Sequence, residues 1–124
     1  LFLKDSSSIV RESAAKGLAK LSFRNKAAVT ALVKALKDSD GDVRKAAAES
    51  LGLFGPKAKA AVPALIKTLK DKEVLVGYHA VQALGRIGVK SKAVLTALDP
   101  FLKHKNPEVR KLAETALKGI NKNK

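Results

Sequence analysis

The chain reads Leu36-Lys37-Asp38-Ser39-Asp40-Gly41-Asp42-Val43-Arg44 at the second of four copies of one pattern. The other copies begin at Leu3, Leu69 and Leu102, so the pattern returns every 33 residues. A fixed period of this size is typical of a stacked repeat array. We therefore expect a single repeat domain over residues 1–124, with units at about 1–22 (partial), 23–55, 56–88 and 89–121.

Apolar residues within each repeat recur at helical spacing. One set runs Val43, Ala47, Leu51 and Phe54, and the same columns recur in the other copies. Steps of four, four and three place these residues on one face of an α-helix. A second set that begins at Val29 predicts another helix in each repeat. We expect antiparallel helix pairs, with A helices near 26–37, 59–70 and 92–103 and B helices near 8–21, 41–54, 74–87 and 107–120.

The residues between these segments agree with helix ends. The slot before each B helix holds Ser7, Asp40, Glu73 or Asn106, and three of these four are good N-caps. Gly55 and Gly88 end B helices, where a left-handed residue can close a helix. Pro100 falls inside the last A helix and is expected to kink or restart it. A column of small residues is expected to let neighbouring helices approach closely; it consists of Ala14, Ala47, Ala80 and Ala113.

The fold class that follows is an all-α, right-handed α-solenoid of about seven helices. The two strings that carry the pattern most fully are 36–52 and Ala61-Val62-Pro63-Ala64-Leu65-Ile66, and they closely resemble HEAT repeats of the short, PBS-lyase-like subtype. The chain departs from that subtype at Gly77, where Arg is usual, and at His104, where Asp is usual. The resemblance implies a structural ladder of ion pairs along the stack, formed by Asp5, Asp38 and Asp71 with Arg11, Arg44 and Arg110.

Composition excludes several classes of site. The chain has no cysteine, so disulfides, thiolate metal sites and a cysteine nucleophile are ruled out. No apolar run approaches the roughly 18–20 residues of a membrane span. No signal peptide is visible, and none of these features assigns a cellular compartment. The apolar start at Leu1 predicts a piece of a longer protein, because repeat arrays normally end in polar capping repeats.

The charge of the chain is strongly positive and unevenly distributed. Its 25 Lys and Arg exceed its 11 Asp and Glu by 14. Seven of the acids sit at the turns from helix A to helix B, whereas the opposite turns carry two basic columns. We expect these columns to form a basic edge, which consists of Arg24, Lys26, Lys57, Lys59, Lys90 and Lys92. Such an edge either keeps the protein soluble or faces an anionic partner.

A candidate partner surface lies on the B helices. The resemblance implies that these helices line the concave face, and their outward positions include Lys45, Glu49, Tyr78, Gln82, Arg86 and Lys111. Tyr and Arg are enriched among residues that dominate binding. The alternative is that Tyr78, the one tyrosine of the chain, is ordinary half-buried surface.

No pattern of residues predicts catalysis. The two histidines, His79 and His104, fall on different segments, and no phosphate-binding glycine loop or nucleophile motif is present. His79 replaces Ala46 and Leu112 of other repeats, which predicts a half-buried spacer. We expect a monomeric, non-catalytic scaffold with no cofactor and no metal, which binds another protein, and the positive charge favours an acidic one. The alternatives are a nucleic-acid-binding module and, by resemblance alone, a subunit of a PBS-lyase-like chromophore lyase.

Overall fold

The computed structural model describes residue 4, residues 7–21 and residues 26–122, with the backbone alone at 19–21. This part of the chain forms seven α-helices and the 3₁₀-helix η2, and it contains no β-strand. In chain order the elements are α1 (Ser8–Leu21), α2 (Lys26–Ala35), α3 (Gly41–Phe54), η2 (Gly55–Ala61), α4 (Val62–Thr68), α5 (Val74–Ile87), α6 (Lys92–Leu102) and α7 (Pro107–Lys122). The all-α prediction is confirmed, and most predicted boundaries lie within two residues of the observed ones.

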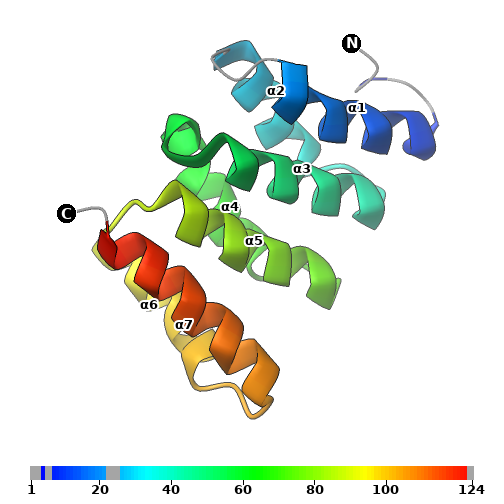
Figure 1. Cartoon of the computed structure of the whole chain (residues 1–124). Coiled ribbons are helices and arrows are strands. Elements are labelled where there is room, and N and C mark those ends of the chain that lie inside the picture. The colour runs from blue at the N-terminus through cyan, green and yellow to red at the C-terminus, as the bar shows by residue number, and fades with distance from the viewer. Residues whose placement is uncertain (1–3, 5–6, 22–25, 123–124) are drawn as a thin grey trace.

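The helices form two layers. The odd-numbered helices lie side by side in one layer, and the even-numbered helices lie behind them (Figure 1). Neighbouring odd-numbered helices pack against one another extensively, whereas the even-numbered helices touch one another sparingly. In a curved stack the helices of the inner layer lie closer together. The odd-numbered layer, which corresponds to the predicted B helices, is therefore the concave one.

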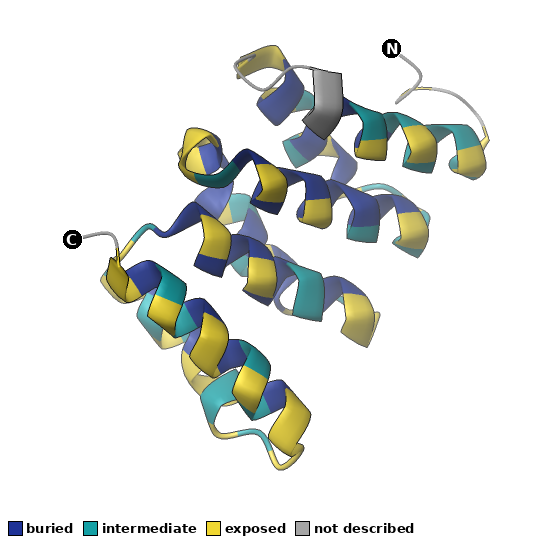
Figure 2. Cartoon of the chain, viewed as in Figure 1, coloured by how far each residue is buried: buried dark blue, intermediate teal, exposed yellow. Residues whose placement is uncertain are grey.

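The core lies between the layers and repeats with the sequence. Each repeat of the even-numbered layer contributes one fully buried leucine, namely Leu32, Leu65 and Leu98. The predicted apolar columns of α3 and α5 face them, with Val43 and Leu84 exposed by at most 1%. Burial follows one face of each helix along the whole stack (Figure 2). The helical periodicity of the sequence thus predicted the core.

The closest approach between B helices lies at a column of small residues that sequence reasoning missed. Three members of the expected column, Ala47, Ala80 and Ala113, are fully inaccessible, whereas the fourth, Ala14, is half-buried. The backbones, however, come closest three to five residues further along. A Cβ atom added to Gly85 would lie 2.6 Å from Ala116 Cα, and one added to Gly52 would lie 3.1 Å from Ala83 Cα. Glycine at these two positions allows α3, α5 and α7 to pack backbone to backbone.

Glycines end the B helices as predicted, but the two endings differ. Gly88 is left-handed, with φ 77° and ψ 17°, and its N–H donates to Leu84 O at 3.0 Å. Gly55 also has a positive φ of 63°, yet its ψ of −142° is not left-handed helical. The chain continues from Gly55 through Pro56 directly into η2. The second A helix was therefore predicted wrongly, since its α-helical part is 62–68 rather than 59–70.

Pro100 does not restart α6, so that part of the prediction is wrong. The helix runs from Lys92 to Leu102 with Pro100 inside it. Proline removes one backbone donor and crowds the preceding turn. The helix ends two residues after Pro100, and the proline ring is exposed. The free-energy cost of proline is therefore confined to the last turn.

Side chains cap the B helices where the sequence has Asp and Asn. Asp40 accepts a hydrogen bond from Asp42 N at 2.8 Å, and Asn106 accepts one from Glu108 N at 2.9 Å. Glu73 makes no capping hydrogen bond with its side chain. This matches the ranking of N-cap residues, in which Glu is absent.

Candidate binding face

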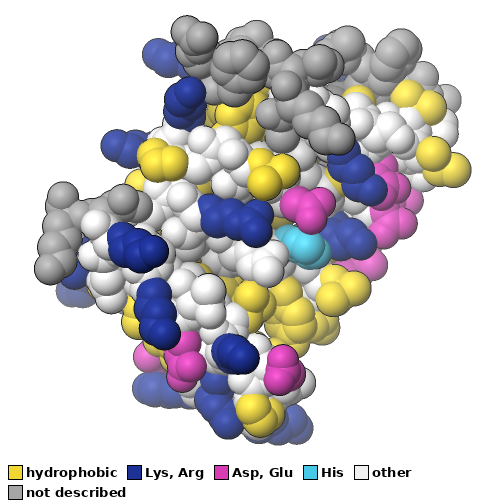
Figure 3. Space-filling model, in the orientation of Figure 1, with side chains coloured by type: hydrophobic (Ala, Val, Ile, Leu, Met, Phe, Trp, Pro, Cys, Tyr) yellow, Lys and Arg dark blue, Asp and Glu magenta, His cyan; other side chains and the backbone are white. Residues whose placement is uncertain are grey.

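Basic side chains line one edge of the molecule, and the opposite edge carries acidic and basic side chains together (Figure 3). Lys26, Lys57, Lys59, Lys90 and Lys92 are all exposed at the turns from B to A helices. Arg24, the remaining member of the predicted basic edge, lies outside the described residues. Acidic side chains gather at the other ends of the B helices (Figure 3). The described residues of the basic edge therefore occupy the turns at which the sequence placed them.

Two rungs of the predicted ladder are present, whereas Arg110, its third arginine, donates to the carbonyl groups of His104 and Lys105 instead of a carboxylate. Arg11 donates to Asp38 at 2.8 and 3.0 Å, and Arg44 donates to Asp71 at 2.8 and 3.1 Å. In both pairs the arginine precedes the aspartate by 27 residues. Asp5 lies outside the described residues. These ion pairs are structural, because each joins the B helix of one repeat to the turn before the next B helix.

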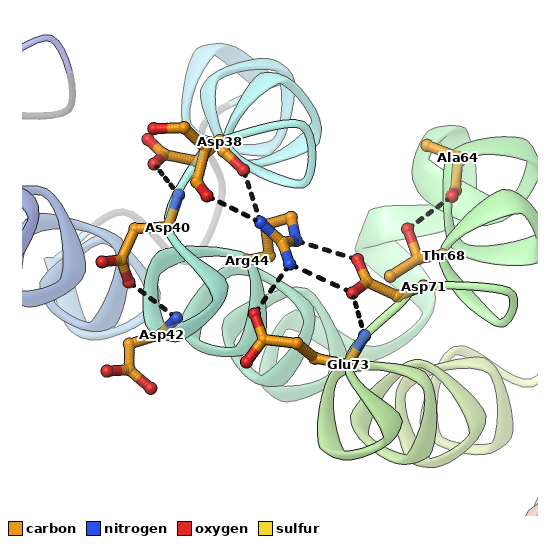
Figure 4. Close-up of polar contacts among 9 residues, drawn as sticks. Asp38, Asp40, Asp42, Arg44, Ala64, Thr68, Asp71 and Glu73 are labelled. Carbon is orange, nitrogen blue, oxygen red and sulfur yellow. Dashed lines mark hydrogen bonds and ion pairs between the residues drawn. The ribbon is translucent and has the colours of Figure 1, made fainter.

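Arg44 is the most heavily engaged side chain of the ladder. It is 5% exposed, and besides Asp71 it donates to Glu73 Oε2 at 2.9 Å and to Asp38 O at 2.8 Å (Figure 4). Burial raises the pKa of Asp71, but hydrogen bonds from Arg44 and from Glu73 N outweigh it and leave the pKa below 3.8. Both partners therefore stay charged at neutral pH. The guanidinium group of Arg44 thus bonds to Asp38 in one turn and to Asp71 and Glu73 in the next turn.

The two departures from the repeat pattern fall on one rung of this ladder. Gly77 and His104 are separated by the same 27 residues as Arg44 and Asp71. His104 keeps the turn contact of the missing aspartate, because its Nδ1 accepts from Asn106 N at 3.0 Å. Asp38 and Asp71 accept equivalent bonds two residues on. Sequence reasoning noted each departure but missed their pairing, although the common spacing could have revealed it.

The predicted partner residues divide into two groups. Gln82, Arg86 and Lys111 are exposed and line a groove of about 820 Å³ over the front of α5 and α7. The other three, Lys45, Glu49 and Tyr78, do not line it. Of these, Glu49 is exposed, and Lys45 and Tyr78 are half-buried.

The groove adds residues that sequence reasoning did not select. Lys118 and Lys122 of α7 are exposed and line it, together with Glu108 and Thr115. Lys118 stands where Gly52 and Gly85 stand in earlier repeats. That break in the glycine column was the available signal, and it was not used because the column itself had not been recognised.

His79 lies between α3 and α5 as a half-buried spacer, as predicted. Its Nδ1 atom is buried and has no hydrogen-bond partner among the described residues. Burial lowers the pKa of His79 below 6.5. The residues around it do not form a metal site, since the described part of the chain holds no group of three or more His, Cys, Asp or Glu side chains suited to a metal ion.

None of the described helices is both long enough and apolar enough to cross a lipid bilayer.

Comparison with known proteins agrees with this architecture. Solved structures with the same fold include a designed armadillo repeat protein in complex with the peptide (KR)4, which is 27% identical with a TM-score of 0.79. That alignment covers 97% of this chain and 62% of the designed protein. A computationally designed armadillo repeat protein for modular peptide recognition is 26% identical with a TM-score of 0.76, over 97% of this chain and 62% of its own.

A natural protein complex shares the fold as well. The complex of CpcE and CpcF of phycocyanin lyase from Nostoc sp. PCC7120 matches at 24% identity and a TM-score of 0.68, over 98% of this chain and 63% of its own. This chain thus spans about three fifths of the length of these structures. A search of curated protein sequences found no match. The family model for HEAT repeats matches residues 1–61 and 56–118, and the chain belongs to the HEAT-repeat family.

Proposed function

We propose that the chain is a non-catalytic module that binds a partner protein on the concave face formed by α3, α5 and α7. The observation that carries this proposal is the groove of about 820 Å³ on that face, around which Gln82, Arg86 and Lys111 come together. Exposed polar and cationic side chains around a concavity are suited to holding another chain. Curved repeat arrays use such extended concave surfaces for binding.

The comparisons support peptide binding as the mode. The designed armadillo repeat protein was solved in complex with a peptide. Its architecture matches nearly the whole length of this chain. A solenoid of this kind therefore has the dimensions to bind a peptide. The side chains of this chain, rather than its fold, decide which peptide fits.

A nucleic-acid partner is the second candidate, and the basic edge favours it. Its described lysines are exposed and repeat along the stack, as phosphate contacts would require. The concave face itself argues against a bound phosphate backbone, because Asp42 and Glu49 are exposed there among the cations. Mixed charge is the common condition at protein interfaces.

The proposal predicts that partner binding is lost when the concave face is changed. Replacing Tyr78 and Arg86 with Ala together removes an aromatic and a cationic side chain that lie two turns apart on α5. Purified variant and wild-type protein are compared as baits for co-purification of partners, which are then identified. Replacing Lys90 and Lys92 with Ala is the matched control at the basic edge.

We expect the control to retain partners that the α5 variant loses, with equal helicity in circular dichroism. Retention of every partner by the α5 variant would contradict the proposal. Titration with DNA and RNA at about 50 and 200 mM salt tests the second candidate. Nucleic-acid binding would be supported instead by an affinity that falls steeply with salt and that disappears when Lys90 and Lys92 are replaced.

A further inference from the structure

We propose that the groove between α5 and α7 binds an extended acidic segment of the partner protein, with the partner's carboxylates paired to Arg86, Lys111, Lys118 and Lys122. This inference rests on the proposed function and names the chemistry of the partner.

The floor of the groove is formed by the small residues Gly85, Ala116 and Gly119. A Cβ atom added to Gly119 would lie 2.6 Å from Gly85 O, and Ala116 is 4% exposed beside them. The backbones of α5 and α7 therefore meet under the groove, and its walls are formed by longer side chains. A partner main chain can approach closely where the floor carries no side chain beyond Cβ.

The walls carry an excess of positive charge that the chain itself does not neutralise. Among the residues that line the groove, four are cationic and Glu108 is the single acid. None of these cations forms an ion pair with another described residue. Elsewhere on the same layer Lys16 is paired with Glu12 at 3.0 Å. The groove thus brings together four cations without a carboxylate partner among the described residues, a property that they share with the described lysines of the basic edge.

The three lysines of α7 lie on one side of the helix at a spacing that suits an extended chain. At 1.5 Å per residue, Lys118 and Lys122 are about 6 Å apart along the helix axis, and Lys111 lies about 10 Å before Lys118. Side chains on one side of an extended peptide repeat about every 7 Å. Carboxylates two residues apart on such a peptide can therefore meet Lys118 and Lys122, and about five residues would span the row from Lys111 to Lys122.

Charge complementarity selects an acidic occupant over a basic or neutral one. An occupant rich in Lys or Arg would place like charges beside four cations, which is unfavourable at an interface. An acidic peptide gains attraction during encounter and pairs with the cations once bound. The single acid, Glu108, lies in the first turn of α7, away from Lys118 and Lys122.

The test uses four fluorescent probes on the whole chain. Three are peptides of about eight residues that alternate Ser with Glu, Gln or Lys, and the fourth is a single-stranded oligonucleotide of similar negative charge. Fluorescence anisotropy at about 50 and 200 mM salt gives the affinities. Two variants reverse the same amount of charge at different places: Lys118→Glu with Lys122→Glu in the groove, and Lys57→Glu with Lys59→Glu at the basic edge.

We expect the Glu peptide to bind more tightly than the Gln and Lys peptides. The groove variant should weaken its binding about tenfold or more, and the edge variant by less than about twofold. Equal losses in both variants would overturn the inference, because they would show attraction to net charge alone. Circular dichroism of both variants checks that helicity is kept.

The remaining outcomes separate this inference from the proposed function. Binding of the Gln or Lys peptide in preference to the Glu peptide overturns the acidic preference and leaves the peptide-binding module standing. Binding of the oligonucleotide alone, weakened by the edge variant, overturns both. Absence of binding by the Glu peptide at the lower salt concentration also overturns the inference, and the co-purification experiment on α5 then tests the module separately.

Discussion

Single residues at the acidic edge show how a repeat protein connects its units. Arg44 is buried and donates hydrogen bonds to carboxylates of the following turn and to two carbonyl groups of its own turn, those of Asp38 and Ser39. Arg110 occupies the same register position in the last repeat and donates to His104 O at 2.7 Å and to Lys105 O at 3.0 Å. It forms no ion pair with a described residue. Arg44 therefore pairs with carboxylates, whereas Arg110 donates to carbonyl groups and has no carboxylate partner among the described residues.

Replacing Arg44 with Ala is expected to lower the free energy of unfolding by about 3 kcal/mol, because Asp71 would remain buried without its cation. Replacing Arg110 with Ala, the matched control, is expected to cost about 1 kcal/mol for its hydrogen bonds to carbonyl groups. Urea denaturation at pH 7 measures both. Equal costs would show that the ion pair with Asp71 adds nothing beyond those hydrogen bonds.

At the scale of elements, helix-to-helix distance is decided by where glycine stands. Gly85 lies under α7, and an added Cβ atom would fall 2.6 Å from a backbone atom of Ala116. Gly17 of α1 is the contrasting case, since an added Cβ atom there meets no described atom within 4 Å. Both residues lie inside helices, where Ala is intrinsically preferred over Gly by about 1 kcal/mol. Packing around each glycine therefore determines whether its replacement by Ala stabilises or destabilises the protein.

Gly85→Ala is expected to destabilise the protein by about 2 kcal/mol, because the clash with α7 exceeds the gain in helix propensity. Gly17→Ala is expected to stabilise it by about 0.5–1 kcal/mol. Thermal and urea denaturation of the two variants would check this opposition. A stabilising Gly85→Ala substitution would mean that α5 and α7 can separate without cost.

At the scale of the whole molecule, the ladder runs along the acidic edge and is interrupted once. The interruption lies between α5 and the turn before α7, where Gly77 and His104 replace the arginine and aspartate of the other rungs. The backbone contacts at Gly85 join the same two helices nearer their other ends. The last repeat is thus held to the stack by backbone packing without an ion pair at that rung among the described residues.

Restoring the ion pair at this rung is expected to stabilise the array by more than the sum of the two single substitutions. Gly77→Arg with His104→Asp should yield an interaction energy of about 1 kcal/mol in a double-mutant cycle. Gly77→Ala with His104→Asp is the control, because it adds the Cβ atom, 3.0 Å from Leu69 O, without the guanidinium. Coupling that is absent with Arg, or equal with Ala, would contradict the 27-residue pairing rule.

The sequence by itself determined the period, the helix pairs and the core columns, and its resemblance to HEAT repeats implied the ladder partners Asp38 and Asp71. These features follow from local spacing and from register, which a linear sequence contains in full. It also placed Gln82, Arg86 and Lys111 on the face that carries the groove, because helical periodicity assigns residues to faces.

Only the tertiary structure showed which side chains of neighbouring helices share a site. Whether Gly85 meets Ala116 or another residue depends on the crossing of α5 and α7, and that crossing arises from packing between repeats rather than from spacing within one. The same packing brought Lys118 and Lys122 beside Arg86 and left Tyr78 outside the groove. The contact from Arg44 to Asp71 also gave the offset of 27 residues between repeats, which assigns Gly77 and His104 to one rung. Periodicity within a helix is local, whereas the geometry between helices is set by the shape of the surfaces in contact.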